Sequence, residues 1–181
     1  MRRGFLVAGI MMIFAGVATL CTLGRVWADT APASTAAAGT DYTKISPIDL
    51  VKNTPKGKLV NPYKDTQPDA VAAGQQFLLS YSCSGCHGGG GGGGMCPPLT
   101  NDTWVYGGDD DTLFRLVTLG SDDLQKQGYT RIGRENVVGP MPPFGTIIKN
   151  SDDLWKILAF VRSKYSGDPA YKFGAPPDPN N

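Results

Sequence analysis

The sequence predicts an all-α protein with three main helices and an irregular N-terminal arm. Two observations support this fold class: apolar residues recur at helical spacing in separate stretches, and no series of alternating apolar residues indicates strands. The compact part is expected over residues 68–166, as one small domain followed by a Pro-rich tail over 167–181. Helices of this length bury a modest core, so a bare domain of this size would be marginally stable.

The N-terminus has the layout of a secretory signal peptide. Two arginines precede a mostly apolar stretch over residues 5–23, and Val26 and Ala28 stand three and one residues before a candidate cleavage site. We expect residues 1–28 to be removed and the product to remain in the periplasm without a stable membrane anchor. The alternative is a retained anchor, because the apolar stretch approaches the length of a membrane span.

Residues 29–67 are predicted to form a linker and an extended arm. The first part is rich in Ala, Ser and Thr, and prolines recur through the second part. The whole chain carries 17 basic and 16 acidic residues. It therefore lacks the basic surplus that nucleic-acid binding requires, and we expect no nucleic-acid partner.

Each of the three helices is marked by its own start and stop signals. The first is expected over residues 69–82, the second over about 111–119 and the third over about 151–165. Aspartates stand in the first turns, where the helix dipole favours negative charge. Gly120 is expected to end the second helix, because glycine adopts the left-handed conformation that commonly follows a helix.

The most specific motif is Cys83-Ser84-Gly85-Cys86-His87. A Cys-x-x-Cys-His run is typical of covalent haem attachment, in which two thiols form thioethers and the histidine binds the iron. The alternatives are a redox pair and a structural zinc site, but zinc needs four Cys or His ligands and the chain has a single histidine. We expect one covalent haem c held by Cys83, Cys86 and His87, and a largely unfolded apoprotein.

The sixth iron ligand is inferred by elimination, because His87 is the only histidine in the chain. Methionine is the next candidate, and after removal of the signal peptide only Met95 and Met141 remain. Met95 follows His87 closely and is expected on the same side of the haem. Met141 is favoured because prolines on both sides stiffen its segment. Two alternatives remain open: Met141 is an ordinary core residue, or the sixth position binds a small molecule.

Several further residues have candidate roles near the haem. Pro97 offers a rigid carbonyl group to His87, whose second ring N–H usually has an acceptor. Four residues are candidates to bind the haem propionates and are equally candidates for ordinary surface or packing positions: Arg131, Arg134, Trp104 and Tyr106.

Seven consecutive glycines, Gly88–Gly94, follow the histidine. No Lys or Ser/Thr stands after them, which excludes a phosphate-binding P-loop. A flexible loop is the simpler interpretation, and the alternative is that the missing side chains let a partner approach the haem edge closely. Cys96 is expected to be a small buried residue rather than a reactive thiol.

These residues together resemble class I c-type cytochromes over about residues 68–165. The matching elements are Gly74 and Phe77 before the haem motif, Pro97-Pro98-Leu99, Met141–Gly145, and a final helix with Trp155, Ala159 and Phe160. The resemblance implies a class I cytochrome c fold with three main helices around one covalent haem, in which the first and last helices cross near Gly74. It also implies that His87 and Met141 bind the iron, and that the protein transfers electrons and is not an enzyme.

A narrower resemblance is to the cytochrome c-L type and, within it, to the XoxG branch. It rests on Met95–Leu99 after the glycines, on Asn101–Asp110 and on Val138–Gly145. The resemblance implies a periplasmic acceptor of electrons from a pyrroloquinoline-quinone (PQQ) methanol dehydrogenase, lanthanide-dependent in this branch, with a downstream cytochrome or oxidase as the next partner. The alternatives are a haem subunit of another periplasmic dehydrogenase complex and an open-site haem enzyme or sensor.

Overall fold

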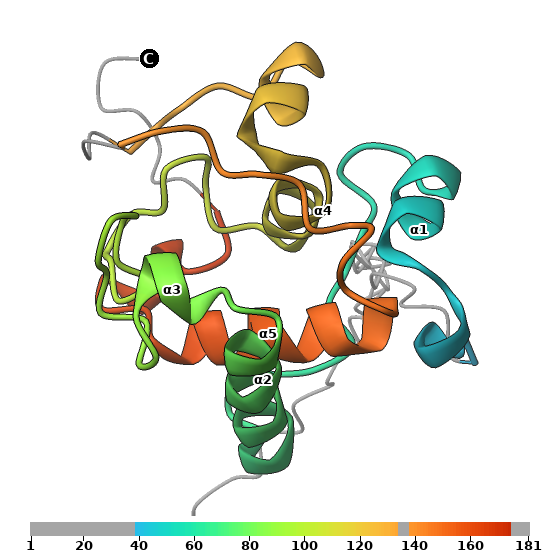
Figure 1. Ribbon diagram of the computed structural model, residues 1–181, viewed down its shortest axis with the longest axis horizontal. Helices are drawn as coiled ribbons and strands as arrows, with labels where there is room; N and C mark the ends of the chain where they lie inside the picture. Colours follow the sequence, from blue (N-terminus) through green and yellow to red (C-terminus); the bar gives the residue numbers. More distant parts are fainter. Residues whose placement is uncertain (1–38, 134–137, 175–181) are drawn as a thin grey trace, which may run out of the picture. The chain divides into compact units, whose positions relative to one another are not determined.

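The computed structural model describes residues 39–133 and 138–174. All regular structure in these ranges is helical, which confirms the predicted all-α class (Figure 1). The elements in chain order are η1 (Tyr42–Lys44), α1 (Pro47–Asn53), α2 (Pro68–Ser80), α3 (Ser84–His87), α4 (Asp110–Lys126), α5 (Ser151–Ser163) and η2 (Pro169–Tyr171). None of the helices in this part of the chain is long and apolar enough to cross a membrane. The expected signal peptide (1–28), Arg134 and residues 175–181 of the tail lie outside the described residues.

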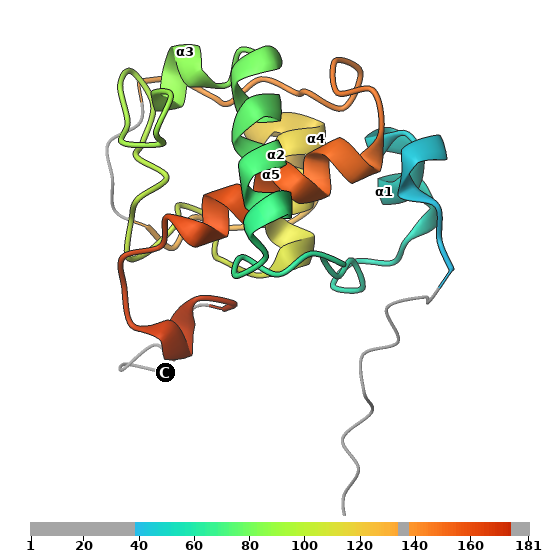
Figure 2. The ribbon, with the colours of Figure 1, turned by 90° about the horizontal axis from the view of Figure 1, so that it is seen from below.

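The centre of the fold is the crossing of α2 and α5 (Figure 2). Gly74 lies at this crossing, where a Cβ atom would stand 2.0 Å from the carbonyl oxygen of Lys156. Only a residue without a side chain lets the two backbones approach so closely. The crossing that the family resemblance implied at Gly74 is therefore present.

Helix α5 is the most deeply buried element. Trp155 and Phe160 are almost fully removed from solvent, and Trp155 packs against the ring of Phe114 from α4 with centroids 4.2 Å apart. Asn150 fixes the start of the helix, because its side-chain oxygen accepts a hydrogen bond of 2.9 Å from the backbone N–H of Asp153. Because its start is fixed and its apolar side chains are buried, α5 provides a rigid wall for a ligand that binds beside it.

Helix α4 is longer than the sequence indicated. The predicted end at Gly120 is only partly correct, because the helix is interrupted there and then continues to Lys126. Gly120 itself has φ 75° and ψ 169°, outside the helical range. A residue with a side chain rarely adopts a positive φ, so glycine permits the break.

The N-terminal arm contains two short helices, η1 and α1, that the sequence analysis did not predict. Ser46 caps α1 by accepting a hydrogen bond of 3.1 Å from the backbone N–H of Asp49. Pro47 occupies the first turn, where its missing N–H costs nothing. The arm is therefore partly regular rather than wholly irregular.

A buried ion pair ties the arm to α4. The Nε of Arg115 donates to the Asp111 carboxylate over 2.8 Å, and these side chains are only 5% and 4% exposed. Arg115 also donates to the backbone carbonyls of Val51 (3.4 Å) and Thr54 (2.7 Å) at the end of α1. The Asp111 carboxylate accepts a further hydrogen bond of 3.1 Å from the backbone N–H of Leu59.

Substitution of Asp111 with Asn is expected to destabilise the fold by about 3–5 kcal/mol, since it leaves the buried Arg115 charge without its partner. The midpoint of urea unfolding measures this loss. Asp123→Asn is the matched control, because Asp123 forms an exposed ion pair on the same helix. The control should change stability by about 1 kcal/mol or less, and equal losses in the two variants would contradict the structural role of Asp111.

The Asp111 carboxylate also makes the stability of the folded protein depend on pH. Burial alone would raise the pKa of Asp111, but hydrogen bonds from Arg115, Tyr129 and backbone amides outweigh it and lower the pKa below its ordinary value. Because the folded pKa is the lower one, this stabilisation is complete above the unfolded pKa of about 4 and is lost as pH falls through the folded pKa. Below about pH 4, the wild-type protein should lose stability more steeply than Asp111→Asn.

Candidate haem site

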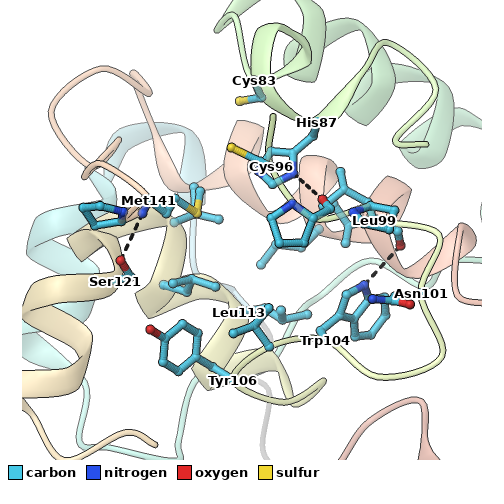
Figure 3. Close-up of a pocket in the computed structure, with 18 of the residues that line it drawn as sticks. Cys83, His87, Cys96, Leu99, Asn101, Trp104, Tyr106, Leu113, Ser121 and Met141 are labelled. Atoms are coloured by element: carbon cyan, nitrogen blue, oxygen red, sulfur yellow. Dashed lines mark hydrogen bonds between the residues drawn. The ribbon is translucent and has the colours of Figure 1, made fainter. Parts of the chain in front are cut away.

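A cavity of about 380 Å³ lies between the helices and two loop segments (Figure 3). One segment runs from Cys96 to Tyr106 and the other contains Met141. Helices α2, α4 and α5 line the cavity with the aliphatic side chains of Leu78, Leu113, Leu116, Val117, Ile157, Leu158 and Val161. The walls therefore favour a large apolar ligand over a polar one.

His87 is the last residue of α3 and lines this cavity. Its ring atom Nδ1 lies 2.9 Å from the carbonyl oxygen of Pro97, which confirms the predicted contact. Since a carbonyl oxygen only accepts, Nδ1 carries the proton and Nε2 keeps a free lone pair. The contact thus fixes the imidazole in the tautomer that binds a metal through Nε2.

The three cysteines of the described chain take different positions. Cys83 is buried and lines the cavity, and burial raises the pKa of its thiol. Cys96 also lines the cavity but is only half-buried; burial, with a contribution from the Cys86 thiol, raises the pKa of Cys96 to about 11. Cys86 is half-buried and is not part of the cavity wall. Cys96 is therefore not the fully buried packing residue that the sequence suggested.

The glycine tract 88–94 forms a loop that is held by backbone hydrogen bonds. The backbone N–H of Gly93 donates to the His87 carbonyl over 2.9 Å, and that of Leu99 donates to the Gly91 carbonyl over 2.7 Å. Gly91 and Gly93 have φ values of 79° and 93°, in the region that favours glycine. At least these two glycines are needed for the shape of the loop.

Met141 reaches into the cavity from the side of α4, whereas His87 enters from the side of α3 (Figure 3). Ser121 holds both polar backbone groups of Met141: the Met141 N–H donates to Ser121 Oγ (3.0 Å), and the Met141 carbonyl accepts from the Ser121 N–H (2.9 Å). Gly120 permits this approach, because a Cβ atom there would lie 2.6 Å from the Met141 carbonyl oxygen. Sequence analysis named neither Ser121 nor this role of Gly120.

The break in α4 also anchors the residues that follow Met141. Because the helix is interrupted, the carbonyls of Val117 and Thr118 accept hydrogen bonds from outside the helix. Their donors are the backbone N–H groups of Phe144 (2.9 Å) and Gly145 (3.0 Å). The segment is therefore held at several points, which leaves the Met141 side chain little freedom to move away.

Met95 occupies a different kind of position. Its side chain is 65% exposed and is not part of the cavity wall. Of the two methionines that remained as candidates, the structure brings only Met141 to the cavity that His87 lines.

Polar residues line the cavity at the end away from the cysteines (Figure 3). The Trp104 indole N–H donates to the Leu99 carbonyl (3.1 Å), so this group is used within the protein. The Tyr106 hydroxyl accepts a hydrogen bond of 2.7 Å from Gln125, which leaves its own proton available to a ligand. Arg131 lines the cavity as well, so two of the predicted propionate partners are suitably placed.

These residues fit one haem. A haem is a flat, largely apolar plate with vinyl groups on one edge and propionates on the opposite one. The aliphatic walls suit its faces, Cys83 suits the vinyl edge, and Tyr106 suits the propionate edge. His87 offers a nitrogen donor and Met141 a sulfur donor, a pair that suits iron in an electron carrier.

This chain is similar to several known proteins. The sequence pattern of the family described as cytochrome c matches residues 71–164. The Cbb3-type cytochrome c oxidase subunit CcoP of Rubrivivax gelatinosus is 29% identical over 103 residues, which are 56% of this chain and only 28% of that protein's length. A solved structure, cytochrome CL from the marine methylotrophic bacterium Methylophaga aminisulfidivorans, is 24% identical with a TM-score of 0.46, over 67% of this chain and 77% of that one.

The family match spans more than half of the chain and includes α5 and the whole candidate site. Together with the helical architecture, it establishes the class I cytochrome c fold that the sequence predicted. It also establishes haem c, bound covalently, as the cofactor that the cavity accommodates. The chain therefore belongs to the cytochrome c family.

Proposed function

We propose that this chain is a periplasmic electron carrier that accepts electrons from a PQQ-dependent methanol dehydrogenase of the lanthanide-dependent kind. It passes them to a downstream cytochrome or oxidase. Membership of the cytochrome c family supports the electron-transfer role. The signal peptide expected over residues 1–28 supports the location.

The proposal assigns the iron ligands to His87 and Met141, and the thioethers to Cys83 and Cys86. When bound, the haem supplies a one-electron change at its iron. The protein's part is to hold the two ligands, through the carbonyl of Pro97 on one side and the backbone of Met141 on the other. The aliphatic walls exclude water, which influences the potential at which the electron is taken up.

One observation supports the assignment of a PQQ methanol dehydrogenase as the electron donor. The segments that resemble the cytochrome c-L type come from two separate parts of the chain, yet both parts contribute to the same cavity: Cys96–Leu99 with the neighbouring Asn101 and Trp104–Tyr106, and then Gly139–Met141. Residues from each of these segments thus lie at the site that an electron donor must reach.

The direct test is reduction of the purified, haem-loaded protein by methanol together with a PQQ methanol dehydrogenase. We expect rapid reduction, seen as a rise in the absorbance of the reduced haem, with the lanthanide-loaded dehydrogenase. Reactions without methanol, and with a dehydrogenase specific for calcium, are the controls. Reduction no faster than in the control without methanol would contradict the proposed donor.

The surface next to the site predicts how the donor docks. Residues 70–101 contain no Asp, Glu, Lys or Arg, and neither do residues 138–148. The second segment ends beside the first, because the backbone N–H of the next residue, Lys149, donates to the Tyr81 hydroxyl over 3.3 Å. The first segment includes the exposed side chain of Met95. We therefore expect docking through uncharged contacts in a small, transient interface.

Uncharged docking should make the reduction rate nearly independent of salt. Raising NaCl from about 10 to about 200 mM should change the second-order rate constant by less than about twofold, because salt screens only charged pairs. Stopped-flow absorbance measures the rate. Met95→Glu adds a charge to this surface and should make the rate depend on salt. A tenfold fall for the wild-type protein would show that charged residues elsewhere guide the docking.

A further inference from the structure

The side chain of Cys96 has no role in the site described above, although it lies beside a cysteine that does. The backbone N–H of Cys96 donates to the Cys86 carbonyl over 3.2 Å. In addition to burial, the neighbouring Cys86 thiol raises the pKa of the Cys96 thiol. A direct backbone hydrogen bond brings two residues to roughly the 4.4–6.8 Å between Cα atoms that a disulfide requires.

The glycine tract explains why these two residues meet. The chain leaves Cys86, turns through the glycines and returns beside it at Cys96. At Gly94 a Cβ atom would lie 2.8 Å from the Cys86 carbonyl oxygen, and at Gly88 it would lie 2.9 Å from the Gly93 carbonyl oxygen. Side chains at these positions would push the part of the loop that leads to Cys96 away from Cys86.

The position of Cys96 also lets its thiol compete with haem for the thiol of Cys86. Cys96 is part of the cavity wall, whereas Cys86, whose carbonyl accepts the backbone hydrogen bond from Cys96, is not. We propose that Cys86 and Cys96 form a disulfide in the chain before haem is attached, and that this disulfide must be reduced before Cys86 can form its thioether. The bond requires only the loop between the two residues, which is closed by its own backbone hydrogen bonds, so it does not depend on the packing of the helices. This inference rests on the haem-binding family and does not depend on the identity of the electron donor.

The chemistry is thiol–disulfide exchange with a low-molecular-weight or protein disulfide as the oxidant. One thiolate attacks the oxidant, forming a mixed disulfide and releasing one thiol; the second cysteine then attacks the mixed disulfide and releases the other thiol. Two electrons and two protons thus pass from the two cysteines to the oxidant, and a dithiol reductant reverses the exchange. Thioether formation adds S–H across a vinyl group, so a Cys86 held in a disulfide has no S–H to add.

The sequence provides its own way to detect this bond, because Met95 directly precedes Cys96. The full chain is produced in a bacterial host with a haem attachment system, free thiols are alkylated, and the haem-free fraction is cleaved after methionine with cyanogen bromide. We expect the fragment that ends at Met95 and the fragment that begins at Cys96 to stay joined without reductant and to separate with dithiothreitol. They should stay joined in Cys83→Ser and separate in Cys86→Ser.

A second readout is the haem-loaded fraction. Without the competing thiol, Cys96→Ser and Cys96→Ala should each raise that fraction by about twofold or more, and added reductant should have little further effect. Fragments that separate without reductant in the wild-type chain would overturn the proposal. So would fragments joined through Cys83 instead of Cys86. The cleavage test is made on the haem-free fraction, so it decides the question even if the variants lose haem for another reason.

Discussion

Replacing Gly74 with alanine is expected to destabilise the protein by at least about 3 kcal/mol, at or beyond the upper end of the usual cost of overpacking. The new Cβ atom would lie 2.0 Å from the Lys156 carbonyl oxygen and 3.0 Å from the Cβ atom of Phe160. The first contact is with backbone, which cannot swing aside as a flexible side chain can. Helices α2 and α5 would have to separate, and both line the haem cavity.

The expected loss of stability in Gly74→Ala is opposite in sign to the change that helix propensity predicts. Helix propensity alone predicts that alanine in place of glycine inside a helix stabilises by about 1 kcal/mol. Gly85 is a matched control, because it is also helical and a Cβ atom there meets nothing within 4 Å. Urea unfolding followed by circular dichroism measures both variants. A Gly74→Ala protein as stable as Gly85→Ala would show that the two helices do not cross at this glycine.

The main helices could be predicted because their signals are local. The apolar spacing over residues 69–82 and 151–165 predicted α2 and α5 to within a few residues. Helix α1 was missed, although Ser46 and Pro47 form a start signal, because seven residues are too few to show an apolar period. The acidic residues before Thr112 were read correctly as a helix start, but one of them, Asp111, proved to be a buried partner of Arg115.

Other features depend on contacts between distant residues, which no local pattern reports. The sequence gives Gly120 as a helix end, and a helix that resumes after it could not be distinguished from a loop. The pairing of Ser121 with Met141 joins residues that are far apart in the chain. The return of the glycine tract to Cys86 likewise depends on backbone hydrogen bonds that seven identical residues cannot reveal.

Within the candidate site, chemistry was easier to predict than position. The Cys-x-x-Cys-His motif and the single histidine pointed to haem and to His87, and the rigidity of Pro97 pointed to its carbonyl as an acceptor. The choice between the two methionines rested on the prolines beside Met141, on the closeness of Met95 to His87 in the sequence, and on the family resemblance. The structure adds that Met95 is exposed and that Met141 faces the cavity, with its backbone bound to Ser121.

Loss of the Met141 thioether should have the largest effect on the redox properties. Met141→Ala removes the sulfur donor from the cavity, and no other methionine of the described residues lines it. Because methionine ligation raises the potential of haem iron, the reduction potential should fall by an amount on the order of 0.1 V. Met95→Ala should leave the potential unchanged, because the Met95 side chain points into solvent.

The most direct test of the proposed His87/Met141 ligation is the absorbance band that arises from charge transfer between methionine sulfur and ferric iron. It is measured on the oxidised wild-type, Met141→Ala and Met95→Ala proteins at matched haem content. The band should be present in the wild-type protein and in Met95→Ala, and absent in Met141→Ala. A band that survives in Met141→Ala and disappears in Met95→Ala would contradict the assignment.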